Sequence, residues 1–194
     1  FYNSSIKSIF VKNVLNIGAS AFEDCENITK IELDNLINVG PSAFKDTNIE
    51  EVILNKNITY ISPQLFASCD KLKKVVLNGE NITIGDASFS GDDTLESINL
   101  NNVVKIEKRA FKYCKAIKEY NLAKVKEIGS GAFINNLELE KFSANSIEKI
   151  DDEILFGCRK LKEIYLNKVK KIPDKFINGC YFSLAKMELK EIDD

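Results

Sequence analysis

Apolar residues recur along this chain with a fixed spacing. A six-residue motif with three apolar positions, seen first in full at Ile28, Ile31 and Leu33, returns about every 22 residues. Nine copies of it keep register over the whole chain. The last two apolar residues of each copy flank one residue of variable type, which is the alternation of a short strand with one buried face. The pattern therefore predicts nine short β-strands.

Two further apolar groups separate one strand motif from the next. The first is a pair such as Leu36 and Val39, and the second is a group such as Ala21, Phe22 and Cys25. A unit of about 22 residues cannot bury its own apolar face, so successive units must stack on one another. We therefore expect a curved, right-handed stack in which the strands form one parallel sheet, about 4.8 Å apart. Glycine recurs at one place in the unit, where we expect a tight turn with positive φ: Gly18, Gly40, Gly85 and Gly129.

The complete motif is Ile17-Gly18-x-x-Ala21-Phe22-x-x-Cys25, followed by Ile28-x-x-Ile31-x-Leu33, and its echoes cover the full chain. This motif resembles the BspA-like (Treponema-type) leucine-rich repeat family. The resemblance implies a leucine-rich-repeat solenoid of the α/β-type repeat class, strand-dominated with little helix, built from about nine repeats of 22–23 residues. That family usually has proline just after the last strand leucine, whereas this chain mostly has asparagine, as at Asn55.

Members of that family are typically long proteins that are secreted or displayed on a cell surface. The resemblance therefore implies adhesion or binding of a host protein, at an extracellular or cell-surface location. Members inside cells also exist, which leaves a cytoplasmic location as the alternative. Neither end of the chain carries a polar capping unit, although solenoids generally need one. We therefore expect residues 1–194 to form a single leucine-rich-repeat domain within a longer array.

Composition narrows the classes of partner. The chain has 194 residues, of which 27 are basic and 29 acidic, giving a net charge of −2. No polybasic stretch favours nucleic acid or an anionic membrane. No apolar run reaches the roughly 18 residues that span a bilayer, so membrane insertion is not expected. The start of the chain does not resemble a signal peptide. Composition thus argues against nucleic acid and membranes as partners, and a protein is the partner that the family resemblance implies.

Five cysteines share one position in the repeat. Those in alternate repeats should lie about 10 Å apart, beyond the roughly 7 Å between α-carbons that a disulfide can bridge. Two of them fall in neighbouring repeats, but an extra residue follows there and leaves their pairing open. The favoured interpretation is a column of buried, reduced thiols that bind no metal and no cofactor. The column consists of Cys25, Cys69, Cys114, Cys158 and Cys180.

No group of residues suggests catalysis. Histidine, the commonest general base and zinc ligand, is absent. The carboxylate pairs Asp92-Asp93 and Asp151-Asp152 lie between elements and are interpreted as solvated turn or capping groups. We therefore expect a protein that is not an enzyme. Four Asn-x-Ser/Thr triplets are either glycosylation sites or coincidence, and both interpretations stay open: Asn3, Asn27, Asn57 and Asn81.

The strand residues that face away from the core are the candidate site. Several are apolar or aromatic and stand beside a column of Lys and Glu, as in surfaces that bind proteins. The alternative interpretations are that such residues merely favour strands, and that the charges merely pair across strands. The candidate partner-binding residues are Phe10, Glu32, Ile53, Val76, Asn99, Asn121, Ser143, Tyr165 and Glu188.

Three roles remain open from these observations. The first is an adhesive or ligand-binding solenoid outside the cell, whose partner docks on the sheet face. The second is an intracellular regulatory scaffold that binds an enzyme or an assembly partner, which reduced thiols favour because secreted domains tend to use cysteine in disulfides. The third is an architectural spacer for another domain.

Overall fold

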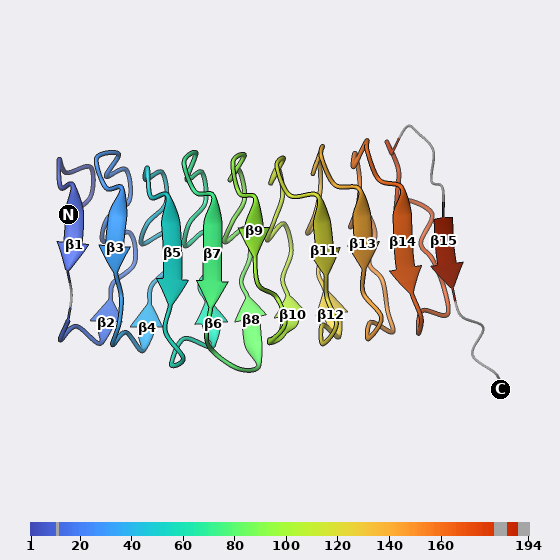
Figure 1. Cartoon of the computed structure of the whole chain (residues 1–194), viewed down its shortest axis with the longest axis horizontal. Helices are drawn as coiled ribbons and strands as arrows, with labels where there is room; N and C mark the ends of the chain where they lie inside the picture. Colours follow the sequence, from blue (N-terminus) through green and yellow to red (C-terminus); the bar gives the residue numbers. More distant parts are fainter. Residues whose placement is uncertain (11, 181–185, 190–194) are drawn as a thin grey trace.

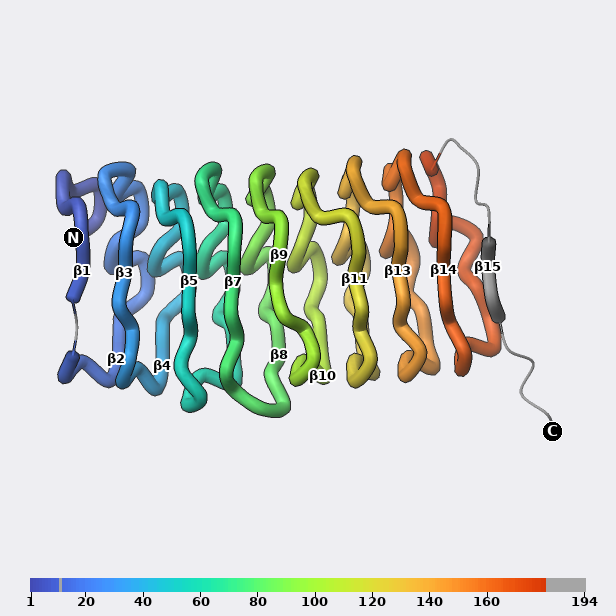
Figure 2. The backbone as a smooth tube through the Cα atoms, viewed as in Figure 1, coloured from blue at the N-terminus to red at the C-terminus, as the bar shows by residue number. Residues whose placement is uncertain are grey.

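The chain winds as a stack of coils that progresses from one end of the molecule to the other (Figures 1 and 2). A computed structural model describes residues 1–10 and 12–180, and the backbone of 186–189. The nine expected strand motifs are confirmed as a row of principal strands. These are β1 (Ser8–Phe10), β3 (Lys30–Glu32), β5 (Glu51–Leu54), β7 (Lys74–Leu77), β9 (Ser97–Ile98), β11 (Glu119–Asn121), β13 (Lys141–Ser143), β14 (Glu163–Leu166) and β15 (Lys186–Leu189).

A second row of strands lies beside the first, so the expectation of one parallel sheet is wrong (Figure 1). In six units the second apolar pair runs in extended conformation with its last residue buried, and this segment pairs with its counterpart in a neighbouring coil. Within the described ranges, no residue is helical. The second row comprises β2 (Asn16–Ile17), β4 (Asn38–Val39), β6 (Tyr60–Ile61), β8 (Ile82–Ile84), β10 (Val103–Ile106) and β12 (Glu127–Ile128).

All strand pairs are parallel, but the principal row is divided into three ladders: β1–β3, β5–β7–β9 and β11–β13–β14–β15. Asn99 explains the end of the middle ladder. Its side-chain amide accepts from the Leu77 amide at 2.6 Å and donates to the Leu77 carbonyl at 3.0 Å. The side chain thus occupies the groups that a longer β9 would use.

Complete turns are slightly fewer than the nine repeats expected, although the solenoid class is confirmed.

The interior contains a continuous column of stacked rings, called here the phenylalanine column. Neighbouring ring centroids lie 5.4–5.8 Å apart, and the rings deviate from parallel by at most 14°. Such spacing places one ring per coil, and every ring except the terminal Phe1, which is 75% exposed, is almost completely removed from water. The column consists of Phe1, Phe22, Phe44, Phe66, Phe89, Phe111 and Phe133.

The last described coils keep the core filled by exchanging residue sizes. Where earlier coils have Ala132 before Phe133, the next coil has Ile154 before Leu155, and the one after has Phe176 before Ile177. Phe176 is 1% exposed, so it has taken the interior place that the column would otherwise leave empty. Exchanges that conserve volume are the core substitutions proteins tolerate best.

The repeated glycines have a different role from the one expected. Gly40 and Gly129 do not adopt positive φ; instead, a Cβ there would lie 2.4 Å from the Ala19 nitrogen and 2.5 Å from the Lys108 nitrogen. Close approach of neighbouring coils therefore requires glycine. Positive φ occurs two residues before and two residues after each column position, as at Ser20 (51°) and Asp24 (58°). These left-handed residues turn the chain around the buried ring.

Candidate protein-interaction surface

The predicted site residues lie on one outward face, that of the principal strands. In β5, Val52 and Leu54 are buried, while Ile53 between them is 56% exposed. Phe10 on β1 is 61% exposed. Register places Phe10 beside Glu32, and Ile53 beside Val76, which is partly buried. The face therefore presents an apolar pair on two hydrogen-bonded strands.

The C-terminal part of the same face is more polar. Asn121, Ser143 and Tyr165 stand in register on β11, β13 and β14. The Tyr165 hydroxyl donates to Glu163 at 2.6 Å, and the Lys141 ammonium lies 5.8 Å from the centre of the Tyr165 ring. The backbone of Glu188 continues the register, but its side chain lies outside the described residues.

Asn99 differs from the other candidates. Its side chain is exposed, yet both its amide groups are bonded to the main chain of Leu77. It interrupts the ladder, so its primary role is structural. Asn99 is therefore on the predicted face, but it presents fewer free polar groups to a partner than its position in the pattern indicates.

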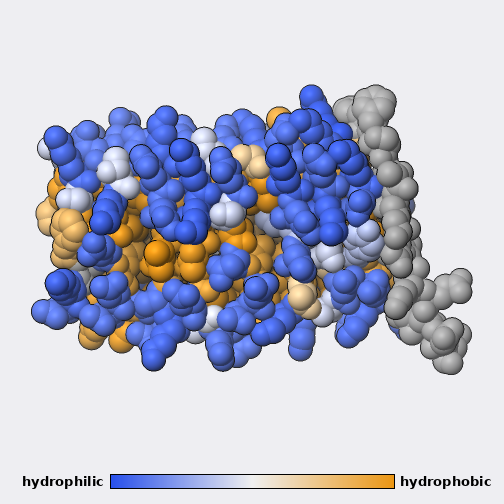
Figure 3. Space-filling view, in the orientation of Figure 1, coloured by the Kyte–Doolittle hydropathy of each residue, from blue (hydrophilic) through white to orange (hydrophobic). Residues whose placement is uncertain are grey.

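Ion pairs form the rim of this face. Lys74 bonds Glu51 at 2.7 Å, and Lys141 bonds Glu119 at 3.1 Å, in each case across adjacent strands. The hydrogen bond from Lys141 to Glu119 raises the pKa of that lysine. Cross-strand pairing in the flanking column is thus confirmed. Figure 3 shows the result as an apolar band along the middle of the face between two hydrophilic rows.

A shallow hollow of about 410 Å³ lies at the N-terminal part of the face. Its lining includes Lys30, Glu32, Glu51 and Ile53, so charged groups of both signs surround one exposed apolar side chain. A hollow of this composition suits a protruding side chain of a partner better than a small apolar ligand.

A second group of exposed apolar residues, which the prediction from sequence did not include, lies immediately before strands β2 and β4 of the second row. Leu15 is 49% exposed, Ile37 is 48% exposed, and the Ile37 amide donates to the Leu15 carbonyl at 2.8 Å. The signal was present in the sequence, because later coils have Lys126 and Glu148 at the equivalent position. These two residues stand on a different face from Ile53.

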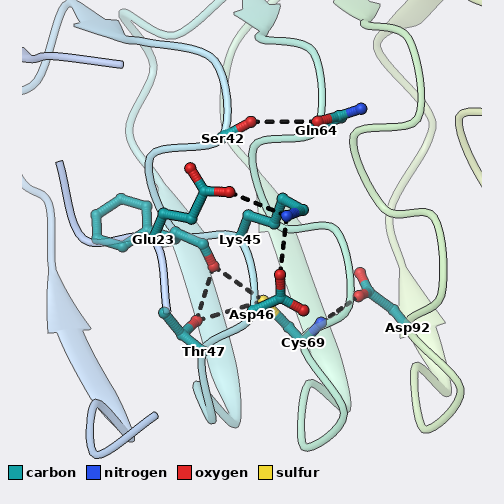
Figure 4. Close-up of polar contacts among 9 residues, drawn as sticks. Glu23, Ser42, Lys45, Asp46, Thr47, Gln64, Cys69 and Asp92 are labelled. Atoms are coloured by element: carbon teal, nitrogen blue, oxygen red, sulfur yellow. Dashed lines mark hydrogen bonds and ion pairs between the residues drawn. The ribbon is translucent and has the colours of Figure 1, made fainter. Parts of the chain in front are cut away.

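Beneath both faces, one column of polar side chains crosses the core, called here the polar ladder. Cys69 is typical: its thiol donates to the Phe44 carbonyl, 3.2 Å away in the preceding coil, and touches the Thr47 hydroxyl at 3.3 Å (Figure 4). The prediction of free cysteines is confirmed; four of the five are buried and Cys180 is partly buried. The ladder consists of Cys25, Thr47, Cys69, Asp92, Cys114, Asn136, Cys158 and Cys180.

Asp92 corrects one expectation. It was interpreted as a solvated turn group, but it is fully buried, because it occupies the ladder position that cysteine has in the coils on either side. One carboxyl oxygen accepts from the Cys69 amide at 2.8 Å, and the other has no hydrogen-bond partner. Burial raises the pKa of Asp92 well above its ordinary value. Burial therefore favours the protonated, uncharged form of this carboxyl group over the carboxylate.

The buried groups offer little chemistry. Burial also raises the pKa of the Cys69 and Cys114 thiols, which keeps them protonated and poorly nucleophilic. In the described part of the chain, no three His, Cys, Asp or Glu side chains come together as metal ligands. Nor does this part contain a helix long and apolar enough to cross a membrane. The arrangement supplies surfaces for contact, with a closed interior behind them.

Comparison with known proteins identifies the class. The sequence pattern of the BspA type leucine rich repeat region matches residues 1–118 and 83–193, in six copies. The chain belongs to this family, whose leucine-rich repeats are generally non-enzymatic protein-interaction modules. Among curated proteins, no match was found.

Three solved structures resemble the chain. A leucine-rich repeat protein from Bacteroides ovatus superposes with a TM-score of 0.73 at 22% identity, covering 96% of this chain and 54% of that one. A leucine rich cell surface protein from Faecalibacterium prausnitzii is 20% identical with a TM-score of 0.45, covering 99% and 75%. A leucine-rich repeat protein from Eubacterium ventriosum is 15% identical with a TM-score of 0.47, covering 93% and 71%. The chain thus spans about half the length of the first protein. At 22% identity, the similarity to that protein supports the fold alone.

Proposed function

We propose that this chain is a non-enzymatic protein-binding module whose partner docks on the face of the principal strands. The observation that carries the proposal is the pair Ile53 and Val76, which stand side by side on β5 and β7 with their side chains outward. The ion pair of Lys74 with Glu51 borders them on the same strands. Interfaces combine apolar anchors with a charged rim in this way.

The proposed partner is a host or cell-surface protein, and the proposed setting is a secreted or surface-displayed protein that uses the array for adhesion. Membership of the BspA-type family supports this setting. Lysines and glutamates pair along the rim, so the face has no strong field of one sign that would select nucleic acid or an anionic membrane. We further propose that residues 1–194 act as one domain of a longer array.

The proposal is tested by placing charges on the apolar pair. The double variant Ile53→Glu, Val76→Glu and the unchanged protein are coated on beads and compared for attachment to intact cells and to immobilised extracellular-matrix proteins. We expect attachment to fall at least about tenfold, because charge burial in an interface costs more than about 1.4 kcal/mol.

Ile37→Glu is the matched control, since it makes the same change at comparable exposure on the other face. This variant should attach like the unchanged protein. Equal loss in both variants would move the docking site to the second row of strands or to charge in general. If the unchanged protein attaches and both variants attach equally well, the face is not the site. If the unchanged protein does not attach, the array is a spacer.

A second candidate is an intracellular scaffold, which the unpaired thiols favour. All five cysteines are free, and four of them are buried, whereas secreted domains commonly pair their cysteines. The two settings are separated by locating the protein in fractionated source cells with an antibody against this chain. Recovery in the culture medium or surface fraction supports adhesion; recovery only in the cytosol supports the scaffold.

A further inference from the structure

Two members of the polar ladder differ from all others in their neighbours. Along the ladder, cysteine alternates with another residue: Thr47, Asp92 and Asn136 separate the first four thiols from one another. The alternation ends at Cys158 and Cys180, which occupy consecutive coils. Within the described residues, this is the one place where two cysteines are neighbours in the ladder.

The two coils stack in register around these cysteines. The Gly157 amide donates to the Asn178 carbonyl at 2.9 Å, and the Leu155 amide donates to the Phe176 carbonyl at 3.1 Å. A Cβ placed on Gly179 would lie 3.5 Å from the α-carbon of Gly157. The residues just before the two cysteines are therefore in close contact. Coils stacked in register lie about 4.8 Å apart, within the roughly 4.4–6.8 Å between α-carbons that a disulfide requires.

Side chains of consecutive ladder members touch. Thr47 and Cys69, which are related as Cys158 and Cys180 are, place the hydroxyl oxygen 3.3 Å from the sulfur. Both thiols of the later pair still point along the ladder, because Cys158 donates to the Phe133 carbonyl at 3.2 Å and Cys180 to the Leu155 carbonyl at 3.1 Å. A thiol is a weak donor, so giving up these bonds opposes a covalent link only weakly.

The pair stands at the end of the described coils, where several apolar side chains are less completely buried than in earlier coils. The phenylalanine column ends at Phe133, and Val169, Ile172 and Ile177 are only partly buried. Cys180 is itself partly buried, whereas Cys158 is fully buried. A reagent can therefore reach Cys180 first, and Cys158 is then positioned to react with it from the interior.

We propose that Cys158 and Cys180 form a disulfide by exchange with a small disulfide such as oxidised glutathione, and that this bond staples the last described coils. The Cys180 thiolate attacks one glutathione sulfur, so a mixed disulfide forms and one glutathione thiolate leaves. The Cys158 sulfur, losing its proton, then attacks the Cys180 sulfur and releases the second glutathione thiolate. Two protein thiols are oxidised, one glutathione disulfide is reduced, and the two protons end on the two glutathiones.

The order of the steps has independent support. The hydrogen bond between the two thiols raises the pKa of Cys158 and lowers the pKa of Cys180. Cys180 therefore ionises first, and the thiolate is the attacking form in thiol–disulfide exchange. The more accessible member of the pair is thus also the more reactive one.

The test exposes the folded protein to glutathione buffers from fully reduced to fully oxidised, quenches with acid, unfolds it and alkylates the free thiols. We expect mass spectrometry to count three free thiols instead of five in the oxidised protein, with one peptide linking Cys158 to Cys180. Proteolysis of the last described coils should also slow by at least about tenfold, because a cross-link suppresses local opening.

Two variants decide the outcome. Cys114→Ser, whose ladder neighbours are Asp92 and Asn136, should still lose two thiols on oxidation. Cys180→Ser should lose none, and its fold is checked by circular dichroism, since a hydroxyl serves in the ladder at Thr47. Retention of all five thiols in the unchanged protein, or a stable mixed disulfide at Cys180, would overturn the proposal. So would equal thiol loss in the two variants.

Discussion

The phenylalanine column and the polar ladder come from the same segment of every coil, three residues apart, yet they repeat different things. The column repeats a side chain: ring follows ring at 5.4–5.8 Å, and it ends where leucine and isoleucine replace phenylalanine. The ladder repeats an interaction, since a thiol or an amide donates to a carbonyl one coil earlier. A stacked ring depends on its shape, whereas a buried carbonyl requires only a donor.

Asp92 is the member that tests this difference. Thiol, hydroxyl and amide all carry a donor at neutral pH, but a carboxyl group carries one only when it is protonated. Its unpartnered oxygen and its raised pKa both follow from placing an acid where the ladder needs a donor. A substitution in the column should destabilise the fold by removing a ring of matching shape, and a substitution in the ladder by removing a hydrogen-bond donor. The following predictions separate these two effects.

The largest effect is expected from opening the column. Phe111→Ala removes a fully buried ring that stacks on Phe89 and Phe133 and contacts Tyr120. We expect the free energy of unfolding to fall by about 3–5 kcal/mol, the usual loss for a buried phenylalanine. Urea denaturation followed by circular dichroism measures it. Phe156→Ala, which truncates a ring that is 36% exposed, is the control and should change stability by much less. Similar losses would show that stacking in the column contributes little.

Breaking the ladder should have the next largest effect. The Asn136 amide donates to the Phe111 carbonyl at 2.8 Å and the Phe133 carbonyl at 2.9 Å, and its oxygen accepts from the Tyr120 hydroxyl at 2.9 Å. Asn136→Leu keeps the volume but leaves these groups unsatisfied, so we expect a loss of about 2–3 kcal/mol in the same denaturation assay.

Asn136→Cys separates lost hydrogen bonding from lost shape. A thiol restores the donor to Phe111, as Cys114 does to Phe89 at 3.0 Å. We therefore expect this variant to lose about 1 kcal/mol, less than the leucine variant, because one bond is kept and the Tyr120 acceptor is weakened. If cysteine destabilises as much as leucine, the ladder is not a repeat of donors.

The contrast between the two columns also explains how far the sequence predicts the structure. The nine strand motifs and the phenylalanine positions are visible because apolar spacing alone determines them. The ladder was only half visible: cysteines repeat by identity, but Thr47, Asp92 and Asn136 repeat only by hydrogen bonding, which spacing does not reveal. Gly40 was identified as special for the wrong reason, since its constraint comes from Ala19 in another coil.

The outward face was predictable as a column but not in detail. Alternation within each strand places Ile53 and Val76 outside, and the structure agrees. That Asn99 bonds the main chain of β7 and ends a ladder could not be inferred, because it depends on the neighbouring coil. Leu15 and Ile37 were passed over because only the apolar pair of that segment, such as Leu36 and Val39, was interpreted, and the segment was not recognised as part of a second row of strands.

A gain in stability is expected where the ladder lacks a donor. Asp92→Asn places an amide, as at Asn136, so that the oxygen keeps the Cys69 amide and the nitrogen supplies a permanent donor. Because the pKa of Asp92 is raised in the folded state, its favourable contribution is complete below its unfolded value of about 3.9. That contribution is lost as the pH rises toward the folded pKa.

The variant should therefore match the unchanged protein at acidic pH and exceed it by about 1–2 kcal/mol at pH 7–8. Urea denaturation at several pH values measures the difference. Asp93→Asn, next to it but only partly buried, is the control and should not reproduce the pH-dependent gain. A variant that is less stable than the unchanged protein at pH 8 would show that the carboxyl group has a partner it needs.

The smallest effect is expected on the outward side of the same strands, which gives the baseline for both interior columns. Lys74 and Glu51 bond at 2.7 Å, but their side chains are 54% and 47% exposed. Solvent screening and side-chain entropy limit such pairs to about 0.2–0.5 kcal/mol. A double-mutant cycle with Lys74→Met and Glu51→Gln measures the coupling, which should fall further in high salt because the pair is exposed. A coupling above about 1 kcal/mol would mean that the face contributes to stability as the interior does, and charge changes there could then not be interpreted as tests of binding alone.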